Sequence, residues 1–266
     1  MKKSIRHSLI AATLLLSHSA MADISSSKAQ QLIDAAGIAE SQAAMQESLL
    51  NDIGADITDS FNEKERKKAK KILIDEFANA DISNKMQSRF ENELNDTDAE
   101  FVLAFLESNL GKRINAMEQA GQAIDSDLAS KKGEALLNDN QLDAFTEQLD
   151  DAIGASDLAF NLAKPIFAVM LNTKLEAHGV NDDSLNLGRM FFDEMVKEAE
   201  PIVIQETRKV LAYTYRDLTQ EERDSFLNFL QDPRSHTFTR ILLEETKQGT
   251  LTVFKTWLVK IGKLNV

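Results

Sequence analysis

The sequence predicts an all-α fold, and two observations carry that prediction. The chain has only three prolines and ten glycines in 266 residues, and no stretch alternates strictly between apolar and polar residues as a half-buried strand does. Apolar residues instead recur every three or four positions, the spacing of the buried face of a helix. Because this spacing extends through most of the chain, we expect helices packed around an apolar core.

The first residues do not belong to that fold. Three basic residues precede the apolar run LIAATLLL, and Ala20 and Ala22 are the small residues at the −3 and −1 positions of a cleavage site. This pattern predicts a cleavable signal peptide over residues 1–22, and its apolar run is too short to span a membrane. We expect export to a Gram-negative periplasm as a soluble protein, without a lipid anchor because the segment has no cysteine.

Helix-ending signals separate the expected helices of the first half. The run AQQLIDAA is expected to end at Gly37, and the next helix runs toward Gly54. A charged helix follows from NEKERKKAKK, with Ile72, Leu73 and Phe77 on its apolar side and most of its lysines on the other. The segment ANADISN is expected to end it.

The second half repeats this order. Gly154 takes the place of Gly37, and helical spacing resumes from Leu158 and again from Met190. Pro201 falls inside the second of these runs, where a proline removes a backbone hydrogen bond and tends to kink a helix.

Two pairs of similar segments divide the chain. LIDAAGIAE from Leu32 resembles LDDAIGASD from Leu149, 117 residues later (149 − 32). The run from Leu94 resembles the run from Leu218, 124 residues later (218 − 94). We therefore predict two tandem related helical domains, residues 23–132 and a diverged copy over 133–266, with the boundary in the polar stretch IDSDLASKKGEALLNDNQ.

The motif shared by both halves predicts a capped helix, a sharp corner and a second helix. Asn95 and Thr219 are suitable N-cap residues, and Glu222 completes a capping box with Thr219. The corner is expected at Ser108 in the first copy and at Asp232 in the second, because each can cap the helix that follows.

The residues around the corner complete this motif. Phe105 and Phe229 occupy matching positions before it, and Pro233 stands at the first helical position, where proline has no hydrogen bond to lose. Gly111 and Lys112 occur in the first copy alone, so any role they have is not shared by both copies. We interpret the motif as structural.

The same segments carry a resemblance. Copy one reads FLESNLGK from Phe105, copy two reads FLQDPRSH from Phe229, and AQQLIDAAGI from Ala29 precedes the first copy. Together they resemble a bacterial exported family named domain of unknown function 2059, present as two tandem copies. Copy one has Asn109 in place of the usual proline, and copy two lacks the glycine and the lysine. The resemblance implies a small helical domain of the bacterial envelope and no established reaction.

No catalytic, cofactor or metal site is recognisable in the sequence. Beyond the signal peptide the chain keeps two histidines, His178 and His236, and no thiol, too few ligands for a histidine or cysteine metal site. The window 52–63 resembles a calcium loop, but Gly54 and Ile57 stand where a ligand and a glycine are required. No nucleophile elbow or phosphate-binding glycine loop occurs. We expect a protein that is not an enzyme and has neither cofactor nor metal.

Composition narrows the choice of partners. Without the signal peptide the chain has 27 basic and 43 acidic residues, a net charge of −16, and this surface disfavours nucleic acid and anionic headgroups. With no cysteine, its 244 residues have to fold without disulfides, which this length permits.

The C-terminal segment carries the only tryptophan of the chain. An apolar stripe with lysines around it consists of Leu251, Phe254, Trp257, Leu258 and Ile261. We favour packing of this stripe onto the second domain, with contact to a membrane surface as the other interpretation.

Two functions fit these observations. The first is a non-enzymatic periplasmic binding or interaction protein of the cell envelope, whose apolar helix faces hold a partner protein. The alternative is a carrier of an apolar small molecule or lipid in a groove between helices. An exposed apolar patch favours the first and an apolar cavity the second, whereas perturbed carboxylates in a cleft favour an enzyme. The sequence leaves the ligand, the partner and the oligomeric state open.

Overall fold

Every regular element in the described part of the chain is a helix, so the predicted all-α fold is confirmed there. The computed structural model describes residues 24–48, 58, 61–122, 124, 126–164, 168 and 182–263. Ala20, Ala22, His178 and most of the window 52–63 lie outside them. The helices are α1 (Ser26–Ala35), α2 (Ile38–Ser48), α4 (Glu63–Ala80), α5 (Ile82–Glu93), α6 (Asp96–Leu106), α7 (Asn109–Gln122), α8 (Ser126–Leu136), α9 (Asn140–Ile153), α11 (Asp182–Tyr215), α12 (Gln220–Gln231) and α13 (Pro233–Gly262), and residues 155–164 are helical as well.

Local signals set the ends of these helices. Thr219 and Glu222 form the predicted capping box at the start of α12, and Asn95 caps α6 by accepting from the backbone N–H of Asp98. The two predicted glycine ends also occur, because Gly37 and Gly154 adopt φ values of +62° and +61°. A residue with a β-carbon is strained in that left-handed region, whereas glycine is not.

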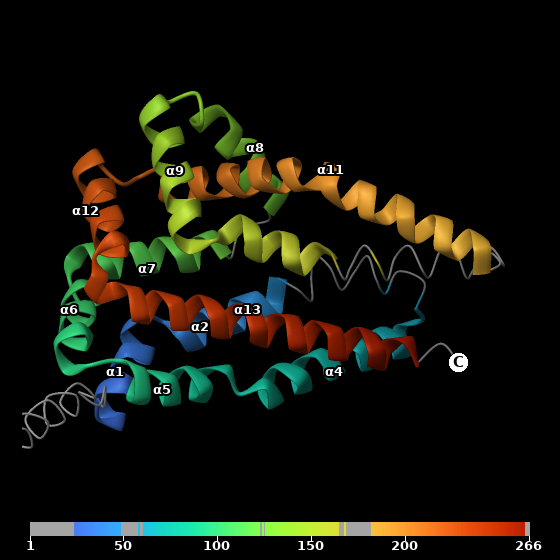
Figure 1. Ribbon diagram of the computed structural model, residues 1–266, viewed down its shortest axis with the longest axis horizontal. Coiled ribbons are helices and arrows are strands. Elements are labelled where there is room, and N and C mark those ends of the chain that lie inside the picture. The colour runs from blue at the N-terminus through green and yellow to red at the C-terminus, as the bar shows by residue number, and fades with distance from the viewer. Residues whose placement is uncertain are drawn as a thin grey trace, which may run out of the picture.

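The two longest helices, α11 and α13, both run along the length of the molecule, with α13 between α11 and the pair α4 and α5 in the view of Figure 1. The helix α13 lies along α4 and α5, and α11 lies against α7, α8 and α9. In α11 the helix continues on both sides of Pro201. The last helix of the predicted second domain therefore packs on helices of the predicted first domain, while α7 of the first packs on α11 of the second.

One apolar core connects both halves of the sequence. Its members include Leu32 of α1, Phe90 of α5, Leu149 of α9 and Ile241 of α13, each with no exposed surface. Residue 132, where we divide the sequence, lies inside α8. The division into residues 23–132 and 133–266 stays a prediction, and the helices of the two halves share this core.

The C-terminal stripe packs inside the protein. Phe254, Trp257 and Ile261 are buried in a second apolar cluster together with Leu73 of α4, and the Trp257 indole N–H donates to the Ala69 carbonyl oxygen at 2.8 Å. The core-packing interpretation is thus confirmed, but the helix that receives the stripe is α4 of the first half, not one of the second. The reason is the length of α13, whose 30 residues extend past α12 to reach α4.

Ion pairs also join α5 to α13. The Arg89 guanidinium contacts Glu93 at 2.6 Å and Glu245 at 2.9 Å, and Arg240 of α13 reaches Glu93 at 2.6 Å. The Arg89 and Arg240 guanidinium groups lower the pKa of the Glu93 carboxyl to about 2.

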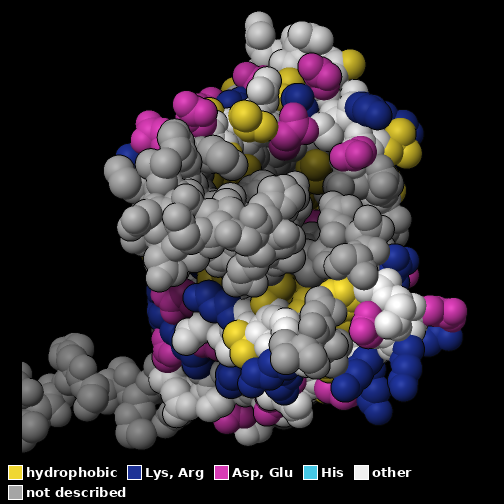
Figure 2. Space-filling model, turned by 90° about the vertical axis from the view of Figure 1, so that its right-hand side faces the viewer, with side chains coloured by type: hydrophobic (Ala, Val, Ile, Leu, Met, Phe, Trp, Pro, Cys, Tyr) yellow, Lys and Arg dark blue, Asp and Glu magenta, His cyan; other side chains and the backbone are white. Residues whose placement is uncertain are grey.

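The surface carries its charges unevenly. Figure 2 shows Lys and Arg side chains gathered on the lower part of one face, over α4, although the whole chain is acidic. The exposed lysines of α4 are Lys64, Lys67, Lys68, Lys70 and Lys71, opposite its buried apolar face. None of the helices in the described ranges is both long enough and apolar enough to cross a membrane.

Candidate functional site: an apolar cavity where the two corners meet

The two predicted corners lie against each other at the end of the molecule where α6 and α12 are found (Figure 1). Phe105 of α6 stacks on Phe229 of α12, with ring centroids 3.8 Å apart and planes within 4° of parallel. Phe105 also faces Phe226 at 6.1 Å, and Phe101 faces Phe229 at 5.9 Å. Stacked aromatic pairs add attraction beyond the burial of their area, so this cluster joins the two helices that precede the corners.

The first corner depends on a serine and a glycine. The Ser108 hydroxyl accepts from the backbone N–H of Gly111 at 3.0 Å and donates to the Phe105 carbonyl oxygen at 2.6 Å. A β-carbon on Gly111 would lie 2.2 Å from that same carbonyl oxygen. Glycine is therefore required where the start of α7 crosses the end of α6. Lys112, the next residue, is exposed.

The second corner is built from other residues. Asp232 caps α13 by accepting from the backbone N–H of Arg234 at 2.9 Å, and Pro233 occupies the first turn. Hydrogen bonds from the Arg234 side chain and backbone lower the pKa of Asp232 to about 2. The buried Ser235 hydroxyl donates to the Phe229 carbonyl oxygen at 2.6 Å. His236 lies beside this corner, with Nε2 3.1 Å from the Gln231 carbonyl oxygen.

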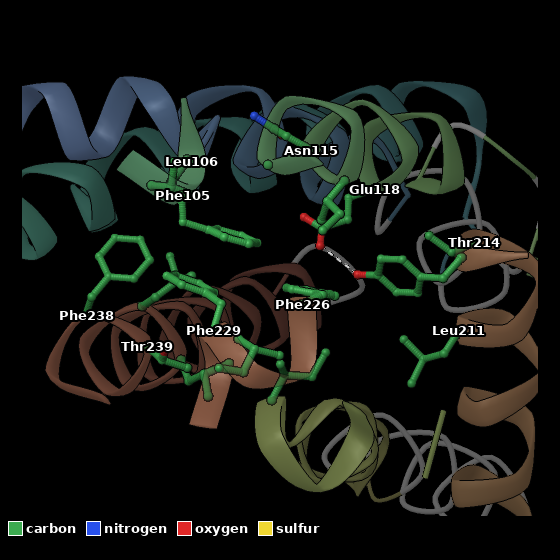
Figure 3. Close-up of a pocket in the computed structure, with 18 of the residues that line it drawn as sticks. Phe105, Leu106, Asn115, Glu118, Leu211, Thr214, Phe226, Phe229, Phe238 and Thr239 are labelled. Atoms are coloured by element: carbon green, nitrogen blue, oxygen red, sulfur yellow. Dashed lines mark hydrogen bonds between the residues drawn. The ribbon is translucent and has the colours of Figure 1, made fainter. Parts of the chain in front are cut away.

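A partly open cavity of about 400 Å³ lies between the corners and α11. Most of its lining is aliphatic or aromatic, and its polar side chains are few (Figure 3). The lining residues are Ala36, Phe105, Leu106, Gly111, Ile114, Asn115, Glu118, Gly121, Ile153, Val210, Leu211, Thr214, Tyr215, Phe226, Phe229, Leu230, Phe238, Thr239, Leu242 and Leu243. A concave, mainly apolar site of this volume is typical of small-molecule binding.

One wall of the cavity carries a buried polar pair. The Tyr215 hydroxyl of α11 donates to Glu118 Oε1 of α7 at 2.6 Å. In Figure 3 a dashed line marks this bond to Glu118, at the side of the cavity where Thr214 and Asn115 also lie. Burial raises the pKa of the Glu118 carboxyl and that of the Tyr215 phenol, because both lie deep among protein atoms. Both residues belong to the lining of the cavity.

Sequence reasoning missed this pair, although a signal for one member exists. Glu118 follows Gly111, Ile114 and Asn115 at helical spacing, so it lies on the face of α7 that the cavity exposes. An acidic residue in such a row marks a buried polar site. Nothing local marks Tyr215, which lies 97 residues further along the chain.

The lining residues of the two corners correspond in sequence. Phe105 and Phe229 are 124 residues apart, the offset between the repeated motifs. Four further pairs of lining residues have this same separation: Leu106 and Leu230, Ile114 and Phe238, Asn115 and Thr239, Glu118 and Leu242. The cavity thus lies between matching faces of the two motifs. Asn115 on α7 matches the polar Thr239 on α13, whereas Glu118 matches the apolar Leu242.

Comparison with other proteins assigns neither a family nor a function to this chain. No family model, no curated protein and no solved structure matches the chain. The resemblance to domain of unknown function 2059 stays a prediction. Among the described residues, no group of three or more His, Cys, Asp and Glu side chains could hold a metal ion.

Proposed function

We propose that this protein binds an apolar small molecule in the cavity between α6, α7, α9, α11, α12 and α13. The observation that carries this proposal is the cavity of about 400 Å³ with a mainly apolar lining. It favours the carrier over the interaction protein. The large exposed apolar side chains in the described ranges are instead spread over α4, α8, α11 and α13: Ile74, Leu128, Ile202, Ile204 and Val259.

The same proposal includes a fused pair of related units. Support comes from the matching corners, from the five lining pairs at an offset of 124, and from the left-handed Gly37 and Gly154, which are 117 residues apart (154 − 37). In such a pair each unit packs against helices of the other. The helix α13 packs on α4 and α5, and α7 and α8 pack on α11. A cavity between the two matching faces is then a product of the fusion itself.

Export to the periplasm is the third part of the proposal. It rests on the basic and apolar residues of segment 1–22 and on the small residues Ala20 and Ala22 before the expected cleavage. A periplasmic carrier of an apolar compound would meet its ligand outside the cytoplasm.

The cavity can be tested by filling it. The uncharged fluorophore N-phenylnaphthylamine is titrated into the wild-type chain and into Leu243→Trp, whose larger side chain occupies the cavity. Val259→Trp is the matched control, since Val259 lies on the same helix but is 61% exposed. We expect saturable fluorescence enhancement in the wild type and in Val259→Trp, and at least a tenfold weaker affinity in Leu243→Trp, which corresponds to about 1.4 kcal/mol.

Native mass spectrometry of the protein purified from its own host supplies a second measurement. A bound mass of lipid size, present in the wild type and lost in Leu243→Trp, is the expected result. Equal fluorophore affinity in all three proteins would contradict a ligand site in the cavity.

A further inference from the structure

The distribution of polar groups in the cavity identifies the kind of ligand it can take, provided that the proposed function holds. The cavity has one polar wall, formed by Glu118 and Asn115 on α7 and by Thr214 and Tyr215 on α11. The facing part of α13 presents Phe238, Leu242 and Leu243, and Thr239 is its one polar lining residue. A ligand that satisfies both walls has one polar end and one apolar end.

Charge balance decides which polar end is possible. None of the described lining residues is Lys or Arg, so the cavity offers no counter-ion to an anionic headgroup. Burial of an unpaired charge is costly, and a fatty carboxylate beside Glu118 would bury one next to a second carboxyl group.

A cationic headgroup is also disfavoured. It would have to form an ion pair with Glu118, the one acidic residue among the described lining residues, and burying both charges carries a desolvation cost that their attraction often does not repay. Burial acts in the same direction on Glu118 alone, because it disfavours the charged carboxylate and raises its pKa. In its uncharged form the carboxyl group donates one hydrogen bond and accepts others. The Tyr215 hydroxyl donates its proton to Glu118 Oε1, which leaves its oxygen as an acceptor toward the cavity.

We propose that the cavity binds an uncharged amphiphile in one orientation, with a hydroxyl or carbonyl head hydrogen-bonded to Glu118 and Tyr215 and an aliphatic chain along Phe229, Phe238 and Leu242. The orientation follows from the difference between the two motifs. At the matching positions 118 and 242, one copy has a carboxyl group and the other has leucine, so the two ends of the cavity are not equivalent.

The test compares ligands that share one aliphatic chain and differ in the head. Decane, decanol, decylamine and decanoate are titrated into the wild-type chain at neutral pH, each by displacement of N-phenylnaphthylamine. We expect decanol to bind more tightly than decane by about three- to tenfold, the value of one net hydrogen bond. Decylamine and decanoate are expected to bind at least tenfold more weakly than decanol.

Variants of the polar wall show where the head lies. Glu118→Leu, which copies Leu242, should reduce the affinity for decanol to that for decane and leave decane unchanged or tighter. Glu118→Gln keeps an uncharged donor and acceptor and should bind decanol within about threefold of wild type. Ala116→Leu introduces the same leucine at an exposed position of the same helix, so it is the control and should change neither ligand. Thermal unfolding of each variant verifies that it is folded.

Two results would overturn the inference and leave the cavity site intact. In the first, decane and decanol displace the fluorophore equally from wild type and from Glu118→Leu, so the head makes no bond to Glu118. In the second, decylamine binds most tightly and loses its affinity in Glu118→Gln, so the site takes a cation. Failure of every compound, decane included, to displace a bound fluorophore would instead contradict the proposed function.

Discussion

The two corners of this protein occupy matching places in the sequence but are built from different residues. At α6–α7 the Ser108 hydroxyl both caps α7 and donates to the Phe105 carbonyl oxygen. At α12–α13 these tasks are divided, because Asp232 caps α13 while the Ser235 hydroxyl donates to the matching carbonyl oxygen of Phe229. What the two corners share is a serine hydroxyl that donates to the phenylalanine carbonyl oxygen near the end of the first helix, an oxygen that also accepts from the backbone N–H three residues later.

This difference between the two corners explains why the first corner requires glycine at position 111. Gly111 and Ser235 are 124 residues apart and stand at matching positions. At position 111 a β-carbon would collide with the Phe105 carbonyl oxygen. At position 235 the serine hydroxyl instead donates to the Phe229 carbonyl oxygen. The loss of glycine from the second copy, visible in the sequence, is therefore compensated by the hydroxyl group of its replacement.

The largest expected effect comes from Gly111→Ala. The new β-carbon would lie 2.2 Å from the Phe105 carbonyl oxygen, so the corner has to open, and we expect a loss of about 3 kcal/mol in the free energy of unfolding. Gly262→Ala is the control, because no atom lies within 4 Å of a β-carbon there. Urea denaturation measures both, and equal stabilities of the two variants would show that the corner is not close-packed.

Ser108→Ala is expected to have the next largest effect. The variant loses the cap of α7 and the bond to the Phe105 carbonyl oxygen together, so we expect about 2 kcal/mol of destabilisation. The exposed Ser225→Ala on α12 serves as the comparison in the same urea experiment. A loss no larger than that of Ser225→Ala would contradict the double role of Ser108.

Ser235→Ala should cost about half as much, about 1 kcal/mol, because it removes the bond to Phe229 but leaves the Asp232 cap in place. The informative quantity is the ratio of the losses in unfolding free energy of Ser108→Ala and Ser235→Ala. If Ser235→Ala were the more damaging, the two corners would not divide their tasks in the way described.

The smallest expected effect is a pH dependence of stability at the second corner, where Asp232 titrates. The Asp232 carboxyl has a pKa of about 2 in the folded protein, below its ordinary value of 3.8, so its contribution is present above pH 4 and is lost as the pH falls toward 2. Asp232→Asn keeps a cap that does not titrate. The unfolding temperatures of wild type and Asp232→Asn should therefore approach each other between pH 4 and pH 2. A constant difference over this range would refute the assignment.

The sequence predicts the local features of this fold well. Helix class, N-caps, the positive-φ glycines and both corners follow from residues within four positions of each other, because capping and turn chemistry are local. The packing partner of α13 was not predictable in this way. The apolar stripe from Phe254 to Ile261 specifies a buried face, but nothing in its spacing distinguishes α4 from a helix of the second half.

The cavity escaped prediction for the same physical reason. Its polar wall pairs Glu118 with Tyr215 across 97 residues, and its volume depends on how six helices leave space between them. The sequence did contain the asymmetry, since Glu118 and Leu242 occupy matching positions of the two motifs. That contrast acquires meaning only once both residues are found in the same cavity.

A crystal structure of the chain grown with decanol tests the central claim most directly. The account predicts one decanol molecule inside the cavity, with its hydroxyl within hydrogen-bond distance of Glu118 and its chain along Leu242 and Phe238. Decanol absent from the cavity, or bound there with its hydroxyl at the α13 wall, would contradict it.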